Sequence, residues 1–429
     1  MKILMLGWEF PPLFTGGLGV ATYGIVKSLN QYSQIRLIIP TAGDASDLED
    51  VNIIGLNKLT KEEIDIESIQ FEIEFDNTRV EKIPLQISPY HFTNASFSGF
   101  FGSNDHPESD QKIDVIRSIF SGRDMYGFNV MHKVHLFALL SAEIASDGDF
   151  DIIHAHDWVT YPAAVRIKKQ SGKPLVVHVH ALETDRVGDT VRNDIYWMER
   201  DGLLEADSIV AVSEYTKEQI VKHYEIDPSK ISVVHNGIEP IPVKRSVHKL
   251  KDKLVIFLGR ITSQKGPNFL LETAEKVVRV YPRVKFVVAG TGDQFGHLLE
   301  STAYRKLGSK FIFTGFLSKT KVNELLSMAD AYFMPSVSEP FGLTALEAAH
   351  HKVPAVISSQ SGAAEVMKGS LQADFWDTDK YANYIHAILK YPALGKILSD
   401  RAALELNDLT WDHAAKKLRN VYDTLLQES

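Results

Sequence analysis

The chain has 429 residues, of which 44% are hydrophobic and 24% charged, and its formal net charge is −9 with neutral histidines. This composition excludes disorder, and at roughly 150 residues per domain the length predicts two or three domains. The negative charge argues against broad contact with nucleic acid. The absence of cysteine excludes disulfides, thiolate zinc sites and cysteine nucleophiles, and it suits a reducing compartment.

The chain starts with a short apolar run at 3–6 that soon turns polar and rich in proline. It lacks the length and the small-residue cleavage site of a secretory signal, so we expect a first strand there. No stretch approaches the about eighteen apolar residues of a membrane-spanning helix. We therefore expect a cytoplasmic protein without a transmembrane segment, and peripheral membrane contact stays open.

Short apolar runs alternate with helical patterns, which is typical of parallel strands buried on both faces by crossover helices. This alternation predicts an α/β protein with two successive sheets. The first sheet is predicted from strands at 3–6, 36–39, 151–154, 174–180, 208–212 and 231–235, with a strand-rich, irregular stretch at 51–86. The second is predicted from strands at 254–258, 285–289, 311–313, 331–334 and 355–357.

Three further segments complete the predicted organisation. Residues 96–122 are rich in Gly, Ser, Asp and Asn without a clear period, which predicts a long loop or insertion. Residues 239–245 are polar and twice broken by proline, so we place a domain boundary there. Residues 410–427 carry apolar side chains at helical spacing and predict an amphipathic terminal helix.

A glycine loop precedes the first predicted helix. Gly16 and Gly17 let the backbone approach a phosphate or a sugar, and the free amides of the following helix favour an anion. A tight turn without a ligand is the alternative. The dinucleotide fingerprint is absent here, and the second glycine run, at 290–296, misses its spacing by one residue. A nicotinamide-dependent dehydrogenase is therefore disfavoured.

Two His-x-His pairs end apolar strands, and residues two apart on a strand share a face. The pairs indicate either a metal site built from imidazoles and carboxylates or neutral groups that orient a substrate. We expect His154 and His178 to be core histidines with satisfied hydrogen bonds. His180 and Asp157 should lie nearer a cleft, and we take them as candidate functional residues.

In the second half, Arg260 and Lys265 follow a strand and precede a helix. Arginine can meet a diphosphate with two donors, and lysine acts as a point charge. The pattern favours a loop that holds a phosphate leaving group. A solvated loop with ordinary surface charges is the alternative.

Two glutamates eight residues apart flank the start of another helix. Glu339 lies in the loop that leaves a strand, and Glu347 lies on the first turns of the helix. Between them, the backbone at Gly342, Leu343 and Thr344 offers amides for a phosphate. This arrangement favours one carboxylate for a sugar and the other for a ribose, with the diphosphate between them.

Together these motifs resemble those of the retaining family-4 glycosyltransferases of the GT-B fold, close to the glycogen, starch and sucrose synthases. The resemblance covers nearly the whole chain and rests on residues 16–18, 154–158, 180–183, 236–238, 260–266 and 339–347. It implies two Rossmann-like, doubly wound domains that face each other across a cleft. The implied parts are an acceptor-side domain at 1–240, a nucleotide-sugar-binding domain at 241–408 and a terminal helix at 409–429 that returns to the first domain.

The resemblance also implies an activity: transfer of a hexose from a nucleoside diphosphate sugar to an acceptor hydroxyl, with retained configuration and no metal or other cofactor. Our first choice is glucose, from ADP-glucose or UDP-glucose, to a glucan or another sugar. By matching position, it implies a diphosphate clamp at Arg260 and Lys265, a donor-sugar contact at Glu339, a ribose contact at Glu347, cleft residues at His180 and Asp157, and a phosphate-facing amide at Gly17.

One position departs from the starch-synthase pattern, because Phe14 stands where those enzymes carry a lysine. Residues 361–365 also look more like the wider family 4. A family-4 transferase of another sugar, such as mannose, therefore stays open. So do a metal-dependent hydrolase that uses the His-x-His pairs, an epimerase, and a nucleotide-sugar-binding protein without turnover.

Overall fold

The structure is a computed structural model that describes residues 1–12, 16–43, 48, 50–60, 63–64, 109–122, 125–127, 130–239 and 251–428. The chain divides into two compact units. Unit 1 comprises Met1–His178, Asp201–Ser208 and Tyr422–Ser429, and unit 2 comprises Val179–Arg200 and Ile209–Val421.

The first sheet has seven strands in the order β3-β2-β1-β4-β5-β6-β7. The strands are β1 (Lys2–Leu6), β2 (Gln34–Ile39), β3 (Asn52–Gly55), β4 (Ile152–His156), β5 (Leu175–Val179), β6 (Ser208–Ala211) and β7 (Ile231–Val233). The central strands β4 and β5 are buried along their whole length. This explains their continuous apolar runs, because helices cover both faces of a parallel sheet.

The second sheet has six strands in the order β10-β9-β8-β11-β12-β13. They are β8 (Lys253–Leu258), β9 (Val284–Ala289), β10 (Phe311–Gly315), β11 (Ala331–Met334), β12 (Ala355–Ser358) and β13 (Leu371–Ala373). All pairings between these neighbours are parallel.

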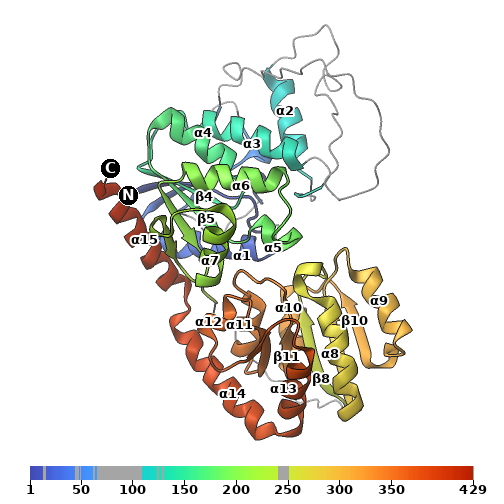
Figure 1. Cartoon of the computed structure of the whole chain (residues 1–429). Coiled ribbons are helices and arrows are strands. Elements are labelled where there is room, and N and C mark those ends of the chain that lie inside the picture. Colours follow the sequence, from blue (N-terminus) through green and yellow to red (C-terminus); the bar gives the residue numbers. More distant parts are fainter. Residues whose placement is uncertain are drawn as a thin grey trace. The chain divides into compact units, whose positions relative to one another are not determined.

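Alternate side chains of β8 enter the two cores of this sheet. Val255 and Phe257 pack with α8 (Pro267–Val280) and α13 (Thr378–Lys390), which lie side by side on one face (Figure 1). Leu254, Ile256 and Leu258 lie in the core of the other face, with residues of α10 (Lys319–Met328), α11 (Leu343–His350), α12 (Ala363–Val366) and α14 (Pro392–Glu405). Unit 2 is thus built around a parallel sheet with helices on both faces, as predicted.

The other helices are α1 (Gly17–Leu29), α2 (Ser109–Phe120), α3 (Val130–Ile144), α4 (Tyr161–Ser171), α5 (Glu183–Val187), α6 (Asp194–Glu205), α7 (Glu214–Tyr224), α9 (Phe295–Tyr304) and α15 (Trp411–Glu428). The helix predicted at 410–427 is therefore present as α15. None of the helices in the described ranges is long and apolar enough to cross a bilayer.

Every predicted strand is present, and two predictions of local structure need correction. The loop predicted at 96–122 is wrong for its second part, where α2 forms because Ile113, Ile116 and Phe120 recur at helical spacing and are buried. The short edge strand β13 was missed. Residues 96–108 of that loop, 65–86 of the irregular stretch and 240–245 of the proposed boundary lie outside the described residues.

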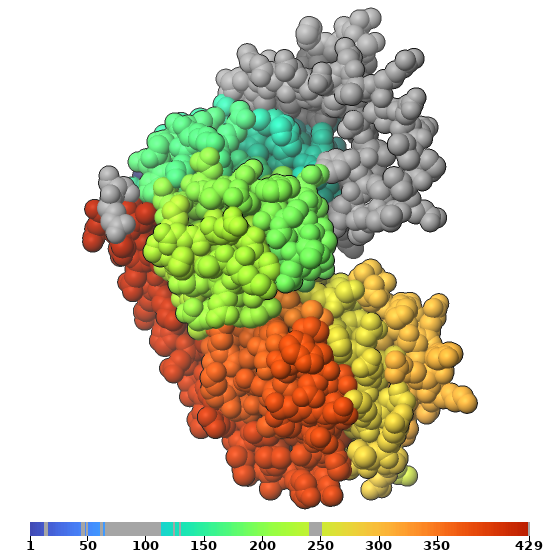
Figure 2. Space-filling model, in the orientation of Figure 1, coloured from blue at the N-terminus to red at the C-terminus, as the bar shows by residue number. Residues whose placement is uncertain are grey.

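One edge of the second sheet is formed by β10. The segment that contains α9 and β10, light orange in Figure 2, lies at the surface. Tyr304 and Phe316 at this edge are 89% and 75% exposed. The carboxyl ends of the central strands β8 and β11 lead into the loops that carry the predicted site.

Candidate active site

Two loops of unit 2 leave the carboxyl ends of the neighbouring strands β8 and β11 and touch each other. The amide of Val337 donates to the carbonyl oxygen of Gln264 at 2.8 Å. Gly266 has a φ of 69°, and a Cβ at this position would lie 2.1 Å from the carbonyl oxygen of Pro335. Only glycine fits so close to the second backbone, so the sequence Lys265-Gly266 brings the two loops together.

This contact brings two predicted site residues together. Lys265 Nζ lies 2.5 Å from Glu339 Oε2, and the two side chains are 18% and 9% exposed. Ser336 Oγ also donates to Glu339 Oε2, at 3.0 Å. A cation and a carboxylate are thus paired with little access to water, where electrostatic interactions are stronger than at an open surface.

The start of α11 follows directly on this pair. Gly342 precedes the helix with a φ of 98°, which favours glycine. Thr344 Oγ1 shares a hydrogen bond of 2.7 Å with the hydroxyl of Tyr332. Glu347 pairs with Lys319. Leu343, Thr344 and Glu347 therefore lie on the first turns of α11, whose first amides are the groups that bind anions in other proteins.

Arg260 is exposed on the same loop as Lys265. The backbone beside it is held by the second glycine run, because Ile261 donates to the carbonyl of Thr291 and accepts from the amide of Gln294, both at 2.9 Å. A Cβ on Gly292 would lie 2.3 Å from the carbonyl oxygen of Ile261. These glycines are thus explained by close backbone packing, without a dinucleotide.

His180 follows β5 and precedes the short helix α5. Burial lowers the pKa of its imidazole to about 3, so the ring is neutral at physiological pH. Within α5, Asp185 accepts a hydrogen bond from Ser338 Oγ. Ser338 Oγ also shares a hydrogen bond of 2.9 Å with the hydroxyl of Tyr215. Burial raises the pKa of Asp185. The segment after His180 is thereby tied to the residue next to Glu339.

The start of α7 is held by Glu365 of the 361–365 segment. Its carboxylate accepts from the amides of Glu214 and Tyr215 at 3.0 and 2.5 Å and contacts His235 Nε2 at 3.1 Å. Burial opposes ionisation of Glu365, but these hydrogen bonds prevail and lower its pKa. A carboxylate at this helix start also complements the helix dipole.

Asp157, Gly16 and Gly17 belong to unit 1. Asp157 comes directly after β4, is buried and has a φ of 57°, a left-handed conformation that is uncommon outside glycine. Such outliers concentrate at functional sites, which supports its selection as a candidate.

The glycine loop of unit 1 is hydrogen-bonded to an acidic side chain, Glu9. The amide of Gly16 donates to Glu9 Oε2 at 3.0 Å, and the hydroxyl of Tyr126 donates to Glu9 Oε1 at 2.6 Å. Gly17 begins α1. Phe14, which marks the departure from the starch synthases, lies outside the described residues.

The histidines of β4 and β5 form a buried cluster. The strand register places His156 opposite His178. His154 Nε2 lies 3.3 Å from His178 Nδ1, and His154 Nδ1 shares a hydrogen bond with the hydroxyl of Tyr422. The ligand atoms of His154, His156 and His178 lie within 4.8 Å of one another. Both ring nitrogens of His154 are engaged, so His154 is a core histidine with satisfied hydrogen bonds, as expected. His178 is buried in the same core, and full satisfaction of its hydrogen bonds stays a prediction.

Sequence reasoning missed four residues that organise these loops: Asp185, Glu199, Tyr215 and Ser338. Glu199 had a detectable signal. It lies four residues after Ile195 and four before Leu203, both buried, and so on the inner face of α6. The other three positions carry no local pattern, because they become neighbours only through the fold.

Two family models of glycosyltransferases match adjacent parts of the chain. Residues 100–240 match the model of Glycosyltransferase Family 4, and residues 241–403 match that of Glycosyl transferases group 1. The glycogen synthase of Mycobacterium tuberculosis is 24% identical over 98% of this chain and 94% of its own.

Two solved structures share the fold along essentially the whole chain. The sucrose-phosphate synthase of Thermosynechococcus elongatus aligns with a TM-score of 0.70 at 16% identity, covering 100% of each chain. Anabaena HepE in complex with UDP and glucose aligns with a TM-score of 0.65 at 15% identity, covering 99% of this chain and 100% of its own.

The two parallel-sheet α/β folds are those of the GT-B class, and the two family models show that the protein is a glycosyltransferase. With adjacent family models that together match residues 100–403, the chain belongs to the family-4 glycosyltransferases and is similar to glycogen synthases.

Proposed function

We propose that the protein is a retaining hexosyltransferase that moves glucose from UDP-glucose or ADP-glucose to a glucan or another sugar. The observation that carries this proposal is the pairing of Lys265 with Glu339 next to the start of α11. A cation, a carboxylate and free helix amides in one place match a diphosphate joined to a sugar. The relative named glycogen synthase and the HepE complex with UDP and glucose support the choice of glucose.

In the proposed reaction, Lys265, Arg260 and the amides of Gly342, Leu343 and Thr344 hold the diphosphate. Glu339 accepts hydrogen bonds from the sugar, and Glu347 accepts them from the ribose. The bond between the anomeric carbon and the phosphate oxygen breaks, and the diphosphate leaves with the electron pair. The acceptor oxygen bonds to the same face of the carbon, and its proton passes to a diphosphate oxygen. The protein acts mainly by stabilising the charge of the leaving group.

His180 acts in this scheme as a neutral group. Because its pKa is about 3, its ring is not in the imidazolium form near pH 7 and does not serve as a general acid. Gly16, Gly17 and Asp157 keep their predicted roles as phosphate and acceptor contacts, and each role can be tested by substitution. The reaction is proposed to need no metal, so turnover should persist in EDTA. No finding supports the hydrolase alternative.

A thermal-shift screen tests the donor. A ligand at one hundred times its Kd adds about 2.7 kcal/mol of stability, so UDP-glucose or ADP-glucose should raise Tm measurably. GDP-mannose serves as the comparison sugar. The transfer itself is tested by release of the nucleoside diphosphate, which should occur when maltooligosaccharide is added. Equal release without an acceptor, or no shift with either glucose donor, would contradict the proposal.

A further inference from the structure

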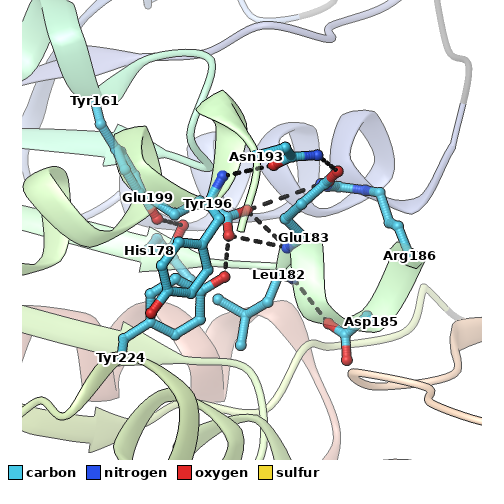
Figure 3. Close-up of polar contacts among 10 residues, drawn as sticks. All are labelled: Tyr161, His178, Leu182, Glu183, Asp185, Arg186, Asn193, Tyr196, Glu199 and Tyr224. Atoms are coloured by element: carbon cyan, nitrogen blue, oxygen red, sulfur yellow. Dashed lines mark hydrogen bonds and ion pairs between the residues drawn. The ribbon is translucent and has the colours of Figure 1, made fainter. Parts of the chain in front are cut away.

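Glu199 is a buried carboxylic acid behind the His180 segment. It lies on α6, and only 1% of its surface is exposed. Figure 3 shows its carboxyl group between the backbone of Glu183 and the ring of Tyr224. A glutamate in such a place needs several hydrogen bonds to offset the loss of water.

Both oxygens of Glu199 hold the start of α5. The amide of Glu183, the first residue of that helix, lies 2.9 Å from Oε1 and 2.9 Å from Oε2, and the hydroxyl of Tyr224 bonds Oε2. A helix of five residues is too short to be stable alone, so its position depends on such anchors.

The side chain of Glu183 adds a second anchor. It accepts from Arg186 Nη1 at 2.9 Å and from Asn193 Nδ2 at 2.8 Å. Arg186 Nη1 lies farther from Glu199, at 3.8 Å from Oε1. The single guanidinium therefore balances the charge of Glu183 first, and a negative charge on Glu199 would be less well compensated.

The same short helix reaches the candidate active site at its other side. Asp185 accepts from the amide of Leu182 at 2.8 Å with one oxygen and from Ser338 Oγ with the other. Ser338 directly precedes Glu339. A continuous series of hydrogen bonds thus runs from Glu199 through α5 to the loop of Glu339.

We propose that Glu199, in its neutral form, is a positioning residue that fixes the His180–Asp185 turn and, through Ser338, the loop of Glu339. This inference rests on the proposed transferase function. In the neutral form the carbonyl oxygen accepts from the Glu183 amide and from the hydroxyl of Tyr224. Ionisation places a second negative charge beside Glu183 and draws Arg186 away from it, which loosens the turn.

The electrostatics agree with a neutral Glu199. Burial raises its pKa to about 8, against the opposing effects of Arg186, Tyr224 and the Glu183 amide. The folded protein then holds a proton that the unfolded chain loses near pH 4.5. Stability contributed by this group is therefore full at low pH and falls as the pH rises toward 8. The charged or titratable groups that face it are Glu183, Arg186, Asp185 and Tyr224.

Two substitutions separate positioning from simple packing. Glu199→Gln keeps an oxygen that can accept from the Glu183 amide and from Tyr224, and it cannot ionise, so turnover at pH 7 should stay close to that of the unaltered protein. We expect kcat of the unaltered protein to fall above about pH 8, and this fall should be absent from the variant. Glu199→Ala should lower kcat by about tenfold to a hundredfold, because the turn is misplaced, with the Kd for UDP unchanged.

Glu205→Gln is the matched control, since Glu205 lies on the same helix but at its exposed end, paired with Lys169. It should behave like the unaltered protein at every pH. The proposal would be overturned if kcat of Glu199→Gln still fell above about pH 8. It would also be overturned if kcat of Glu199→Ala stayed within twofold of that of the unaltered protein.

A measurement without turnover keeps this test independent of the donor. In protein labelled with ¹⁵N-glutamate, the amide signal of Glu183 should shift with a midpoint near pH 8, and Glu199→Gln should abolish that shift. If the unaltered protein transfers no sugar, the proposed function fails while this titration still decides the state of Glu199. A Glu183 amide that is insensitive to pH between 6 and 9 would refute the neutral-acid role.

Discussion

Removing the ammonium group of Lys265 is the most direct test of the candidate active site. In Lys265→Ala the carboxylate of Glu339, 9% exposed in its side chain, loses its cation at 2.5 Å and keeps the hydroxyl of Ser336. Because the site retains some water, we expect a stability loss of about 1–3 kcal/mol, below that of fully buried pairs.

The catalytic effect of Lys265→Ala should be larger than its effect on stability suggests. The lysine is proposed to stabilise charge that grows on the leaving diphosphate, and loss of one such donor lowers kcat by about a hundredfold or more. That factor corresponds to about 2.7 kcal/mol of transition-state stabilisation. Release of nucleoside diphosphate under saturating donor measures it, and circular dichroism checks the fold.

Lys253→Ala provides the matched control. Lys253 begins β8, the strand that leads to Lys265, and it pairs with Asp330 at 2.7 Å, away from the candidate site. Lys253→Ala should be slightly less stable than the unaltered protein and should have the same kcat. If Lys265→Ala turns over at a near-normal rate, or if both variants lose activity equally, the diphosphate clamp is wrong.

Three further predictions follow from other contacts. Tyr422→Phe removes the hydroxyl that bonds His154, so the free energy of unfolding should fall by about 1 kcal/mol while KM for the donor is unchanged; an unaltered Tm would contradict this. The NMR signals of the His180 ring should not titrate between pH 5 and 8, because burial lowers its pKa to about 3. Since the unfolded imidazole binds a proton near pH 6.5 and the folded one does not, the free energy of unfolding should fall as the pH drops below that value. A titration midpoint of His180 near pH 6.5 would contradict this prediction. Gly266→Ala would place a Cβ 2.1 Å from the carbonyl oxygen of Pro335 at a positive φ. The free energy of unfolding should therefore fall by about 1–3 kcal/mol, and turnover should fall with it. Normal values of both Tm and turnover would show that the two loops can separate freely.

Much of the fold could be predicted because its strands and helices produce local patterns of apolar residues. Strands buried on both faces, such as β4 and β8, are continuous apolar runs that stand out from their surroundings. The helix α2 was missed because its polar start hid the spacing of Ile113, Ile116 and Phe120. The strand β13 has only three residues and is paired at the edge of its sheet, so its pattern is too short to detect.

The candidate site was predictable in its residue types and only partly in its contacts. Glycines that precede helices, and charged residues after strands, marked Lys265, Glu339 and Gly342. The ion pair between the first two could not be foreseen, because they lie 74 residues apart and meet through the fit of Gly266 against another loop. Glu199 was missed because a glutamate is expected at the surface unless its partners are known.

The ion pair between Lys265 and Glu339 also affects which small molecules should compete with the proposed donor. Inorganic phosphate would take the lysine and leave the glutamate charged, poorly hydrated and facing an anion. A complete sugar nucleotide offers each of the two groups a replacement, since its phosphates suit the ammonium and its hydroxyls suit the carboxylate. If the proposed site roles hold, this mutual neutralisation disfavours inorganic phosphate, and we expect phosphate to be a weak inhibitor.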